Sequence, residues 1–478
     1  MKSKILLVNP PAGAKELYGD IFGSVAPSLP PLGIAYIAAV LIDRGFDVVM
    51  QDYAIRNISI EKAVSDILEH NPDFLGVTST TLQYNTAMKI IDAVKAKDPS
   101  IKIVLGGSHF TALPVKSFED IKGLDYGIVG EGEYSFCDLI EGKSMQDIEG
   151  LVFRKEGDIF YKDDFAIIKD LNSLPYPARS LLPLYQYLPS PVNYKKLPST
   201  NMITSRGCAG KCDFCIDGSR DGNVRFLSSD KVFEEIKLIK EKFGISDIAI
   251  KDDAFMQDKE RIFELCNMLI EKNSKIHWNC MSRVDDVLDE RMLAIMKKAG
   301  CYQVGVGVET FNAETLKNHN KVIEREKTIK AVELLKKARI ESRLFFIVGF
   351  PEERDEDILN TFRFAEMLDP DIFQVCVLIF FPGTKLREDC KRIHGFNDEN
   401  WDSYLPFCPD YAPTFTPYVP KQELTRLFYK GYSDFYSKPR RIIRNLWKTA
   451  RNLGFKRTVA DVIKKALFLY KIRRQSLN

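Results

Sequence analysis

Two long stretches of the sequence alternate short apolar or β-branched runs with amphipathic helical segments. From residue 201 six such runs recur, each followed by a helical segment: NMITSR, DIAIKDD, IHWNCMS, YQVGVGVET, LFFIVGF and FQVCVLIF. Strands that alternate with helices join through right-handed crossovers into a parallel sheet. We therefore expect residues 201–390 to form a partial (β/α)6 barrel with its functional residues at the C-terminal ends of the strands.

The first 150 residues show the same alternation on a smaller scale. Apolar runs such as KILLVNP, DVVMQD, FLGVTST, IKIVLGG and YGIVGEGE are separated by helical segments. This predicts an α/β, Rossmann-like, doubly wound domain over residues 1–150, with ligands at the carboxyl ends of the strands. A hairpin and a proline-rich linker are expected over 151–200. Residues 391–437, rich in aromatics and prolines, are expected to cap one end of the barrel.

Composition sets the broad class and the compartment. The chain has 478 residues, too many for one ordinary domain, and 45% hydrophobic and 28% charged residues are typical of a folded soluble protein. The opening MKSKILLVNPP holds an apolar run too short for a signal peptide, and GIAYIAAVLI at 33–42 is about half a membrane span. We expect a cytoplasmic location, where clustered cysteines bind metal more often than they form disulfides.

The C-terminal tail differs electrostatically from the rest of the chain. The net charge is +2, yet residues 438–478 hold thirteen Lys and Arg against a single acid, Asp461. On a helical wheel the basic residues separate from an apolar face that includes Trp447. This predicts a basic amphipathic helical tail that either contacts the inner face of a membrane or folds back on the acidic body. Nucleic-acid binding is disfavoured because the tail's basic stripe has one aromatic residue and the body is acidic.

Three cysteines follow the first expected barrel strand. In SRGCAGKCDFCIDG, Cys208, Cys212 and Cys215 stand close together. A 4Fe-4S cluster held by three thiolates keeps one iron open, as a catalytic zinc keeps one position free, so the fourth ligand is expected to be a substrate or cofactor. The alternatives are accidental clustering and a structural zinc site closed by Cys280 or Cys301. A zinc ribbon normally offers a second close pair, and no other CxxC occurs.

The CxxxCxxC pattern on this loop resembles the radical S-adenosylmethionine (SAM) superfamily, and Phe214, the aromatic residue before the last cysteine, also fits. The resemblance implies that the amino and carboxylate groups of SAM fill the open iron site. It also implies that an electron, from a donor such as flavodoxin or ferredoxin, cleaves SAM to a 5′-deoxyadenosyl radical.

Further motifs extend the resemblance over about 200–385. IKDDAF resembles the acidic second-strand motif, MSRVD the third-strand segment whose Arg binds the SAM carboxylate, GVGVET the fourth-strand Glu motif, and FIVGFPEE the Gly-x-Pro turn beside the adenine. The SAM contacts that this implies are Asp253, Arg283, Glu309, Gly349 and Pro351.

Two of these residues also suit purely structural roles. Arg283 can instead pair with Asp285 or Asp286, and Glu309 can cap the next helix. A strand-end Arg facing a carboxylate ligand is favoured, because a guanidinium binds a carboxylate bidentately.

The first domain resembles the cobalamin-binding domain that precedes the barrel in one large radical SAM class. The order and spacing of SLPPLGIAYIAAVLIDRGFDVVMQDY, VTSTTLQYNTAMKII, IKIVLGGSHFTALP and DYGIVGEGE carry this resemblance. Glycines let the backbone approach a large flat ligand, and threonines supply hydroxyls. The implied cobalamin contacts are Asp52, Thr78, Thr80, Gly106, Gly107, Gly130 and Glu131.

One departure concerns the lower axial ligand of cobalt. The Asp-x-His-x-x-Gly signature is missing after Asp52, as it is in many members of this class, so the lower ligand is unassigned. His109 is the nearest histidine, but a lone His more often forms hydrogen bonds. A Rossmann-like domain that binds another ligand is the alternative. The methylthiotransferases, which carry a second cluster on N-terminal cysteines, are excluded because the first 200 residues contain only Cys137.

The resemblance implies a cobalamin-dependent radical SAM methyltransferase that acts on an unactivated carbon of a small-molecule or lipid substrate. Its expected cofactors are a 4Fe-4S cluster, SAM and cobalamin. A cyclase or oxygen-inserting enzyme without methyl transfer is the main alternative, and a cobalamin or redox sensor is a third. The sequence does not identify the substrate, although the amphipathic tail favours a lipid or isoprenoid.

Overall fold

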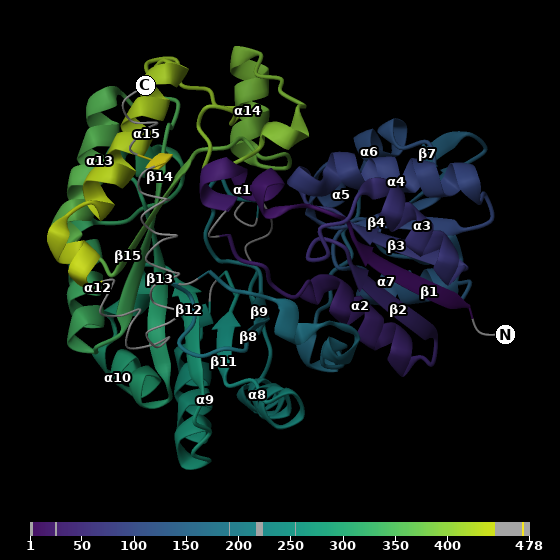
Figure 1. The fold of residues 1–478 in the computed structure, drawn as a ribbon, viewed down its shortest axis with the longest axis horizontal. Coiled ribbons are helices and arrows are strands. Elements are labelled where there is room, and N and C mark those ends of the chain that lie inside the picture. Colours follow the sequence, from purple (N-terminus) through teal and green to yellow (C-terminus); the bar gives the residue numbers. More distant parts are fainter. Residues whose placement is uncertain are drawn as a thin grey trace.

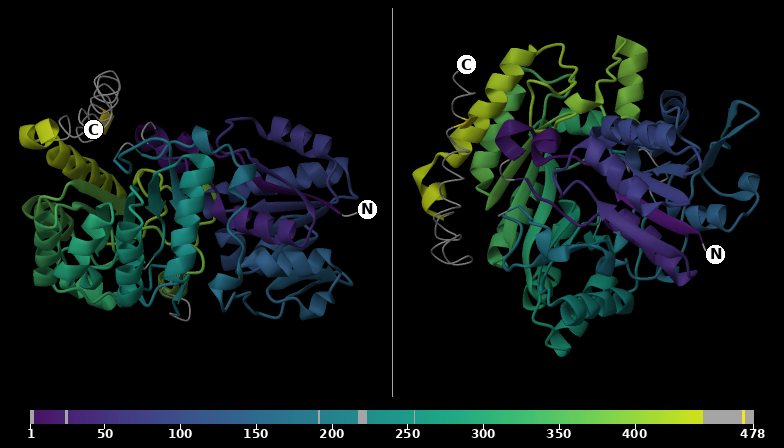
Figure 2. Two further views of the ribbon diagram at one scale, coloured as in Figure 1. Left: turned by 90° about the horizontal axis from the view of Figure 1, so that it is seen from below. Right: turned by 45° about the vertical axis from the view of Figure 1, so that its right-hand side comes forward.

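Two sheets, side by side, organise the chain in the computed structural model (Figure 1). The structure describes residues 3–23, 26–190, 192–216, 223–253, 255–444 and 471–472. One continuous cluster of buried apolar side chains runs through both units, so their cores are joined. Figure 2 shows the two units from two further directions, with the C-terminal helices on the barrel side.

The first unit is a seven-stranded sheet in the order β2-β1-β3-β4-β5-β6-β7. Its strands are β1 (Lys4–Asn9), β2 (Asp47–Asp52), β3 (Phe74–Thr78), β4 (Lys102–Gly106), β5 (Tyr126–Ile128), β6 (Leu151–Lys155) and β7 (Asp158–Phe160). The strands β1 to β5 are parallel, which confirms the doubly wound fold. The expected hairpin forms β6 and β7, which pair antiparallel and extend this sheet.

Helices cover both faces of the first sheet. They are α2 (Leu32–Asp43), α3 (Ile60–His70), α4 (Tyr84–Lys97), α5 (Ser108–Ala112), α6 (Pro114–Asp120) and α7 (Gly132–Ile140). The sequence explains their ends: the Ser59 side chain caps α3 by accepting from the amide of Lys62, and Asn71 ends α3 in a left-handed conformation.

The second unit is an open, all-parallel sheet of six strands in the order β15-β14-β13-β12-β11-β8. Its strands are β8 (Ser199–Met202), β11 (Asp247–Ile250), β12 (His277–Ser282), β13 (Cys301–Glu309), β14 (Glu341–Val348) and β15 (Ile372–Val377). Its outer helices are α8 (Ser229–Phe243), α9 (Lys259–Glu271), α10 (Glu290–Lys298), α11 (Ala313–Asn318), α12 (Arg325–Lys337) and α13 (Asp355–Leu368). All six expected strands are present, which confirms the partial barrel.

The N-terminal helix α1 (Ala14–Phe22) contacts the C-terminal region instead of the first sheet alone. The Phe22 ring lies 5.1 Å from that of Phe407 and 5.3 Å from that of Tyr432. In Figure 1 this helix lies between the first unit and the C-terminal helices α14 (Lys385–His394) and α15 (Lys421–Tyr436). Residues far apart in sequence therefore tie the capping region to both units.

The start of the basic tail folds back on the body. Lys438 pairs with Glu366 at 2.9 Å, and Arg441 and Arg444 pair with Asp369 at 3.0 and 3.2 Å, beyond the end of α13. Most of the predicted amphipathic tail, 445–470 and 473–478, lies outside the described residues. In the part of the chain that is described, every helix is too short or too polar to cross a bilayer.

Candidate active site between the two sheets

A cavity of about 720 Å³ opens between the two units. From the first unit it is lined by α2, by the ends of β3 and β4, and by the Gly-Glu-Gly-Glu segment 130–133. The barrel contributes the start of the cysteine loop and the residues after β11. Of the residues predicted from sequence, the cavity brings together Thr78, Gly106, Gly107, Gly130 and Glu131 with Cys208 and Asp253.

Glycines shape the wall for two different reasons. Gly107 has φ +97°, and a Cβ there would lie 2.5 Å from the carbonyl oxygen of Ser79, so only glycine suits its backbone. At Gly106 the nearest atom to an added Cβ is 3.9 Å away. A side chain at 106 would therefore enter the cavity without disturbing the protein around it.

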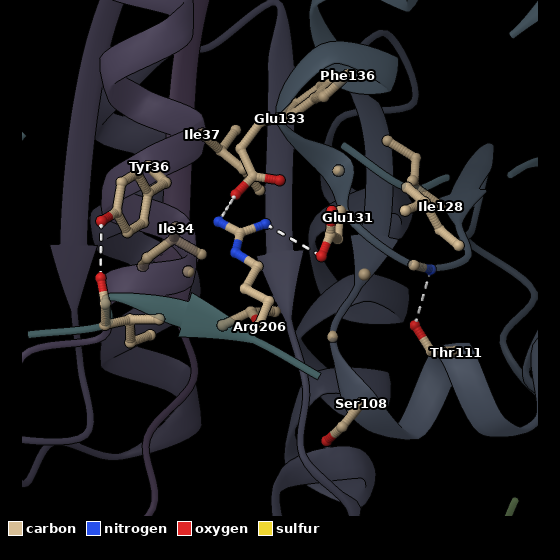
Figure 3. Close-up of a pocket in the computed structure, with 18 of the residues that line it drawn as sticks. Ile34, Tyr36, Ile37, Ser108, Thr111, Ile128, Glu131, Glu133, Phe136 and Arg206 are labelled. Atoms are coloured by element: carbon tan, nitrogen blue, oxygen red, sulfur yellow. Dashed lines mark hydrogen bonds and ion pairs between the residues drawn. The ribbon is translucent and has the colours of Figure 1, made fainter. Parts of the chain in front are cut away.

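Part of the cavity wall is apolar. Leu7, Ile34, Ile37, Val77 and Phe136 belong to this part. Figure 3 shows Ile34, Ile37 and Phe136 around Arg206 and its glutamate partners. A wall of this mixed kind offers apolar contacts together with a few polar groups, as ligand pockets commonly do.

A pair of short strands anchors the cysteine loop on the first unit. The strands β9 (Ser205–Arg206) and β10 (Arg225–Phe226) are antiparallel, and they place Arg206 opposite Arg225 at the base of the loop. Arg225 donates from both terminal nitrogens to the two oxygens of Glu131, each at 2.8 Å. Arg206 pairs with Glu133 at 2.6 Å and with Glu131 at 3.4 Å (Figure 3).

These arginines decide the charge state of Glu131. Burial alone would raise the pKa of its carboxyl, but the hydrogen bond from Arg225 and the charge of Arg206 outweigh burial and hold that pKa below its usual value. The ion pairs are largely shielded from solvent, with Glu131 16% and Arg225 21% exposed. Glu131 therefore links the two units, a role that its motif did not suggest.

The three cysteines of the loop are free thiols, with Cys212 buried and the other two half-buried. The amide of Gly210 points at the sulfur of Cys208, 3.4 Å away. The guanidinium of Arg283 lies directly over Gly210, because a Cβ there would be 2.4 Å from Nη1. Three thiols on one loop, a donor amide and a nearby cation fit an anionic iron–sulfur cluster.

The zinc alternative finds no support. Among the described residues, no group of three or more His, Cys, Asp or Glu side chains is arranged to hold a metal ion. A 4Fe-4S cluster spreads its cysteine ligands over separate irons and does not require them to meet at one point. Cys280 and Cys301 hydrogen-bond to each other inside the barrel, where burial raises the pKa of Cys280.

Behind the loop, Glu309 forms a buried ion pair with Lys321. Glu309 has φ +67° and follows a register shift at the end of β13, which turns its carboxylate toward Lys321. Burial raises the pKa of the Cys212 thiol, whereas the charges of Lys321 and Arg283 act in the opposite direction. Lys321 was not identified from the sequence, because no motif marks it.

Two structural roles were open from the sequence: Glu309 could cap the next helix, and Arg283 could pair with Asp285 or Asp286. The next helix, α11, is capped by Asn312 and not by Glu309. Asp285 pairs with Lys327 at 3.5 Å. The charge of Arg283 lowers the pKa of Asp286, which also accepts a hydrogen bond from the backbone amide of Arg283, so an interaction of Arg283 with Asp286 stays open.

The turn after β14 is held by a buried glutamate. Glu353 accepts from the amides of Gly349 and Phe350 at 2.8 and 3.1 Å, and from the hydroxyl of Thr310 at 2.7 Å. Burial raises the pKa of Glu353 to about 7 despite these donors. Pro351 lies within this turn, which the glutamate fixes from inside the protein.

A charged bridge joins this turn to the cysteine loop. The Nδ1 atom of His319 lies 2.9 Å from Asp213, which stands between the second and third cysteines, and Nε2 lies 3.1 Å from Glu352. Burial alone would lower the pKa of His319, but the two carboxylates raise it to about 9. The Phe214 ring packs edge-on at 5.7 Å from that of Phe350, so it supports this bridge and does not line the cavity.

Three further candidates lie away from the cavity wall. Asp52 accepts hydrogen bonds from Tyr187 at 2.7 Å and from Asn9 at 2.8 Å, and Thr80 donates to Gln83. The ring of His109 lies 4.0 Å from that of Tyr84, and burial lowers its pKa to about 3. No histidine lines the cavity within the described ranges, so the lower ligand of cobalt stays unassigned.

Comparison with known proteins agrees with this arrangement. Residues 202–365 match the Radical SAM superfamily, and residues 19–140 match the B12 binding domain. The two matches fall on the two units that enclose the cavity. The chain is a radical SAM enzyme with a cobalamin-binding domain. The matches to these two families confirm the expected cofactors, which are a 4Fe-4S cluster, SAM and cobalamin.

Relatives of this radical SAM enzyme extend over most of its length. It is 28% identical over 450 residues to an uncharacterized methyltransferase of Pyrococcus horikoshii, covering 93% of this chain and 95% of the relative. It is 26% identical to the anaerobic magnesium-protoporphyrin IX monomethyl ester cyclase of Rubrivivax gelatinosus, covering 80% and 70%. The fold is similar to that of the radical SAM methyltransferase TsrM of Kitasatospora setae, with a TM-score of 0.66, 19% identity, and coverage of 82% and 79%.

Proposed function

We propose that this enzyme transfers a methyl group to an unactivated carbon of a small-molecule substrate. The single observation that carries the proposal is one cavity walled by Cys208 on one side and by Gly106, Gly107 and Gly130 on the other. Bound there, the 4Fe-4S cluster with SAM supplies a radical, and cobalamin supplies a methyl carrier. An electron donor such as flavodoxin or ferredoxin completes the system.

Each part of the site has a task that its chemistry suits. The three loop cysteines hold the cluster. Arg283, whose guanidinium overlies the loop at Gly210, offers a bidentate contact to the SAM carboxylate. We assign contacts with the polar groups of SAM to Asp253, which is on the cavity wall, and to Glu309, whose charge acts on Cys212 and which is paired with Lys321.

The first unit supplies a surface for a large flat ligand. Gly106 and Gly107 let the backbone approach it, and Thr78 offers a hydroxyl at the same wall. The apolar side chains of the wall reduce the access of water to a bound ligand, which radical chemistry favours. The ion pairs of Glu131 and Glu133 hold the loop against this surface.

The second candidate is a cyclase or oxygen-inserting enzyme, which the similarity to the Rubrivivax gelatinosus cyclase favours. Full-length protein, reconstituted anaerobically with iron, sulfide and cobalamin, separates the two when it is incubated with reductant and SAM. Methyl transfer predicts S-adenosylhomocysteine in at least an equal amount to the bound corrin, besides 5′-deoxyadenosine. 5′-Deoxyadenosine without S-adenosylhomocysteine contradicts methyl transfer and supports the cyclase.

We further propose that the substrate is a lipid or an isoprenoid. We also propose that residues 438–478 contact the surface of a membrane. Because Arg441 and Arg444 are engaged by Asp369, we assign the membrane contact to the residues beyond 444. Flotation with anionic liposomes, with and without residues 445–478, tests this. Loss of flotation on truncation supports the contact, and unchanged flotation rejects it.

A further inference from the structure

We propose that Lys251 and Arg343 bind an anionic group of the substrate, a carboxylate or a phosphate, inside the barrel. The inference rests on the proposed function, because it takes the barrel lumen next to the cavity as the substrate site. The substrate is then an organic acid or a phosphate ester.

The strand register places both cations in one row across the sheet. Ala249 pairs with Asn279, so Lys251, two residues further on, is level with Met281. Met281 pairs with Gly305, and Gly305 pairs with Arg343. Residues level with one another in a parallel sheet direct their side chains to the same face.

The common face is the lumen of the barrel. Along β14, half-buried positions such as Arg343 and Phe345 alternate with fully buried ones that pack toward the helices. A Cβ at Gly305 would lie 2.8 Å from Phe345 and 3.4 Å from Met281, so the side chains of these two neighbours fold over Gly305 on the same face of the sheet. Lys251 lines the cavity, whereas Arg343, in the same row, is not among the residues that line it.

The positive charge of Arg343 is held in place but not neutralised. Its terminal nitrogens donate to the neutral oxygens of Asn193 at 2.6 Å and Gln374 at 2.5 Å. Its guanidinium lies 4.8 Å from the ring centre of Phe345. Its Nε atom is buried without a hydrogen-bond partner.

In the described part of the chain, the ionisable groups that act most strongly on Arg343 are tyrosines and Cys376, and the one that acts on Lys251 is Arg343, so neither cation has a carboxylate as its main partner. Charged groups are rarely buried unless they are paired, because removing a charge from water is unfavourable. Burial and the charge of Arg343 lower the pKa of Lys251 to about 8. The two positive charges therefore repel each other inside the protein. A bound anion offsets this repulsion and accepts a hydrogen bond from Nε of Arg343.

The position of the pair suits a substrate group. Lys251 and Cys208 line the same cavity, so an anion held by the two cations places the attached carbon skeleton between the lumen and the cysteine loop. Arg283, not this pair, lies over the cysteine loop where the SAM carboxylate is expected. The proposed substrate site (Lys251 and Arg343) and the expected site of the SAM carboxylate (Arg283) therefore use different cations.

Protection of Lys251 from acylation tests the proposal on the full-length reconstituted enzyme. The protein is treated anaerobically with a limiting amine-acylating reagent, and modification of Lys251 is read by mass spectrometry with inorganic phosphate, succinate or SAM present. We expect phosphate or succinate to slow acylation roughly tenfold at about ten times the dissociation constant. Protection by phosphate alone indicates a phosphate ester, and protection by succinate indicates a carboxylate.

Variants assign the effect to Arg343. Arg343→Gln is expected to abolish protection, Arg343→Lys to retain part of it, and Arg363→Gln, at an exposed site on α13, to leave it unchanged. Iron and corrin contents of the same samples show whether the cofactor sites are intact, which separates a failure of this inference from a failure of the proposed function. No protection by either anion, or protection by SAM that phosphate and succinate do not mimic, overturns the inference.

Discussion

The two carboxylate oxygens of Glu131 each lie 2.8 Å from a terminal nitrogen of Arg225. This pair joins the cobalamin-binding domain to the base of the loop that carries the three cysteines. The cross-strand partner of Arg225 is Arg206, which binds Glu133 and the same Glu131. The relative position of the two cofactor sites thus depends on a compact group of four charges.

The four charges of Glu131, Glu133, Arg206 and Arg225 are predicted to stabilise the protein. Glu131→Gln keeps the shape of the side chain but removes the charge that Arg206 and Arg225 share. We expect the free energy of unfolding to fall by about 1–3 kcal/mol in urea titrations, because two shielded guanidinium groups lose their counter-charge. Glu141→Gln is the matched control, since Glu141 pairs with Arg44 at an exposed site and should cost less than about 1 kcal/mol. Equal losses in the two variants would contradict the account.

His319 predicts a distinct pH dependence. Its pKa is about 9 in the folded protein and about 6.5 when unfolded, so its stabilising effect is fully present below about pH 6.5 and is lost as the pH rises through 9. His319→Gln should remove a difference in stability on the order of 1–3 kcal/mol between pH 6.5 and pH 9.5. His394→Gln, at an exposed site on α14, should leave that difference in place. An unchanged pH profile for His319→Gln would rule out a charged bridge.

The two adjacent glycines of the cavity wall should respond differently to alanine. Gly107→Ala forces a Cβ against the Ser79 backbone at positive φ, and we expect it to lower stability by about 1–3 kcal/mol. Gly106→Ala should leave the stability of the cofactor-free protein within about 1 kcal/mol but weaken cobalamin retention roughly tenfold, because its methyl group projects into the cavity. Thermal unfolding and corrin absorbance after gel filtration measure the two effects. Full retention of cobalamin by Gly106→Ala would mean that the ligand lies elsewhere.

The cysteine loop predicts a selective loss of iron. Reconstituted wild-type protein should hold about four irons per chain, and Cys212→Ala should hold less than half of that. Cys137→Ala is the control, because Cys137 is also a buried free thiol but lies in the core of the first unit. Colorimetric iron and sulfide assays check this. Wild-type iron content in Cys212→Ala would reject the loop as the cluster site.

Much of the fold could be predicted from local patterns. Each of the six barrel strands is an apolar run followed by a helical segment, and such periodicity is set within about twenty residues. The place of the cysteine loop after β8 follows from the same pattern. Cys208 and Gly107 reach one cavity because both follow parallel strands whose carboxyl ends face each other.

What could not be predicted depends on contacts between distant segments. Glu131 lies in a motif that resembles a cobalamin contact, yet its partner Arg225 is 94 residues away and comes into reach only through the β9–β10 pair. Asp52 is at the end of β2 as expected, but Tyr187 from the linker covers it. Lys321 and His319 stand in a segment with no motif, and only the fold brings them to Glu309 and Asp213.

The central claim is that one iron of a cluster on this loop is left open by the protein and takes SAM as its ligand. The most direct test is the EPR spectrum of the reduced, reconstituted full-length enzyme with SAM labelled with ¹⁷O in its carboxylate. The account predicts a 4Fe-4S signal that shifts on addition of SAM and broadens with the labelled carboxylate. A 4Fe-4S signal that is identical with and without SAM would contradict it.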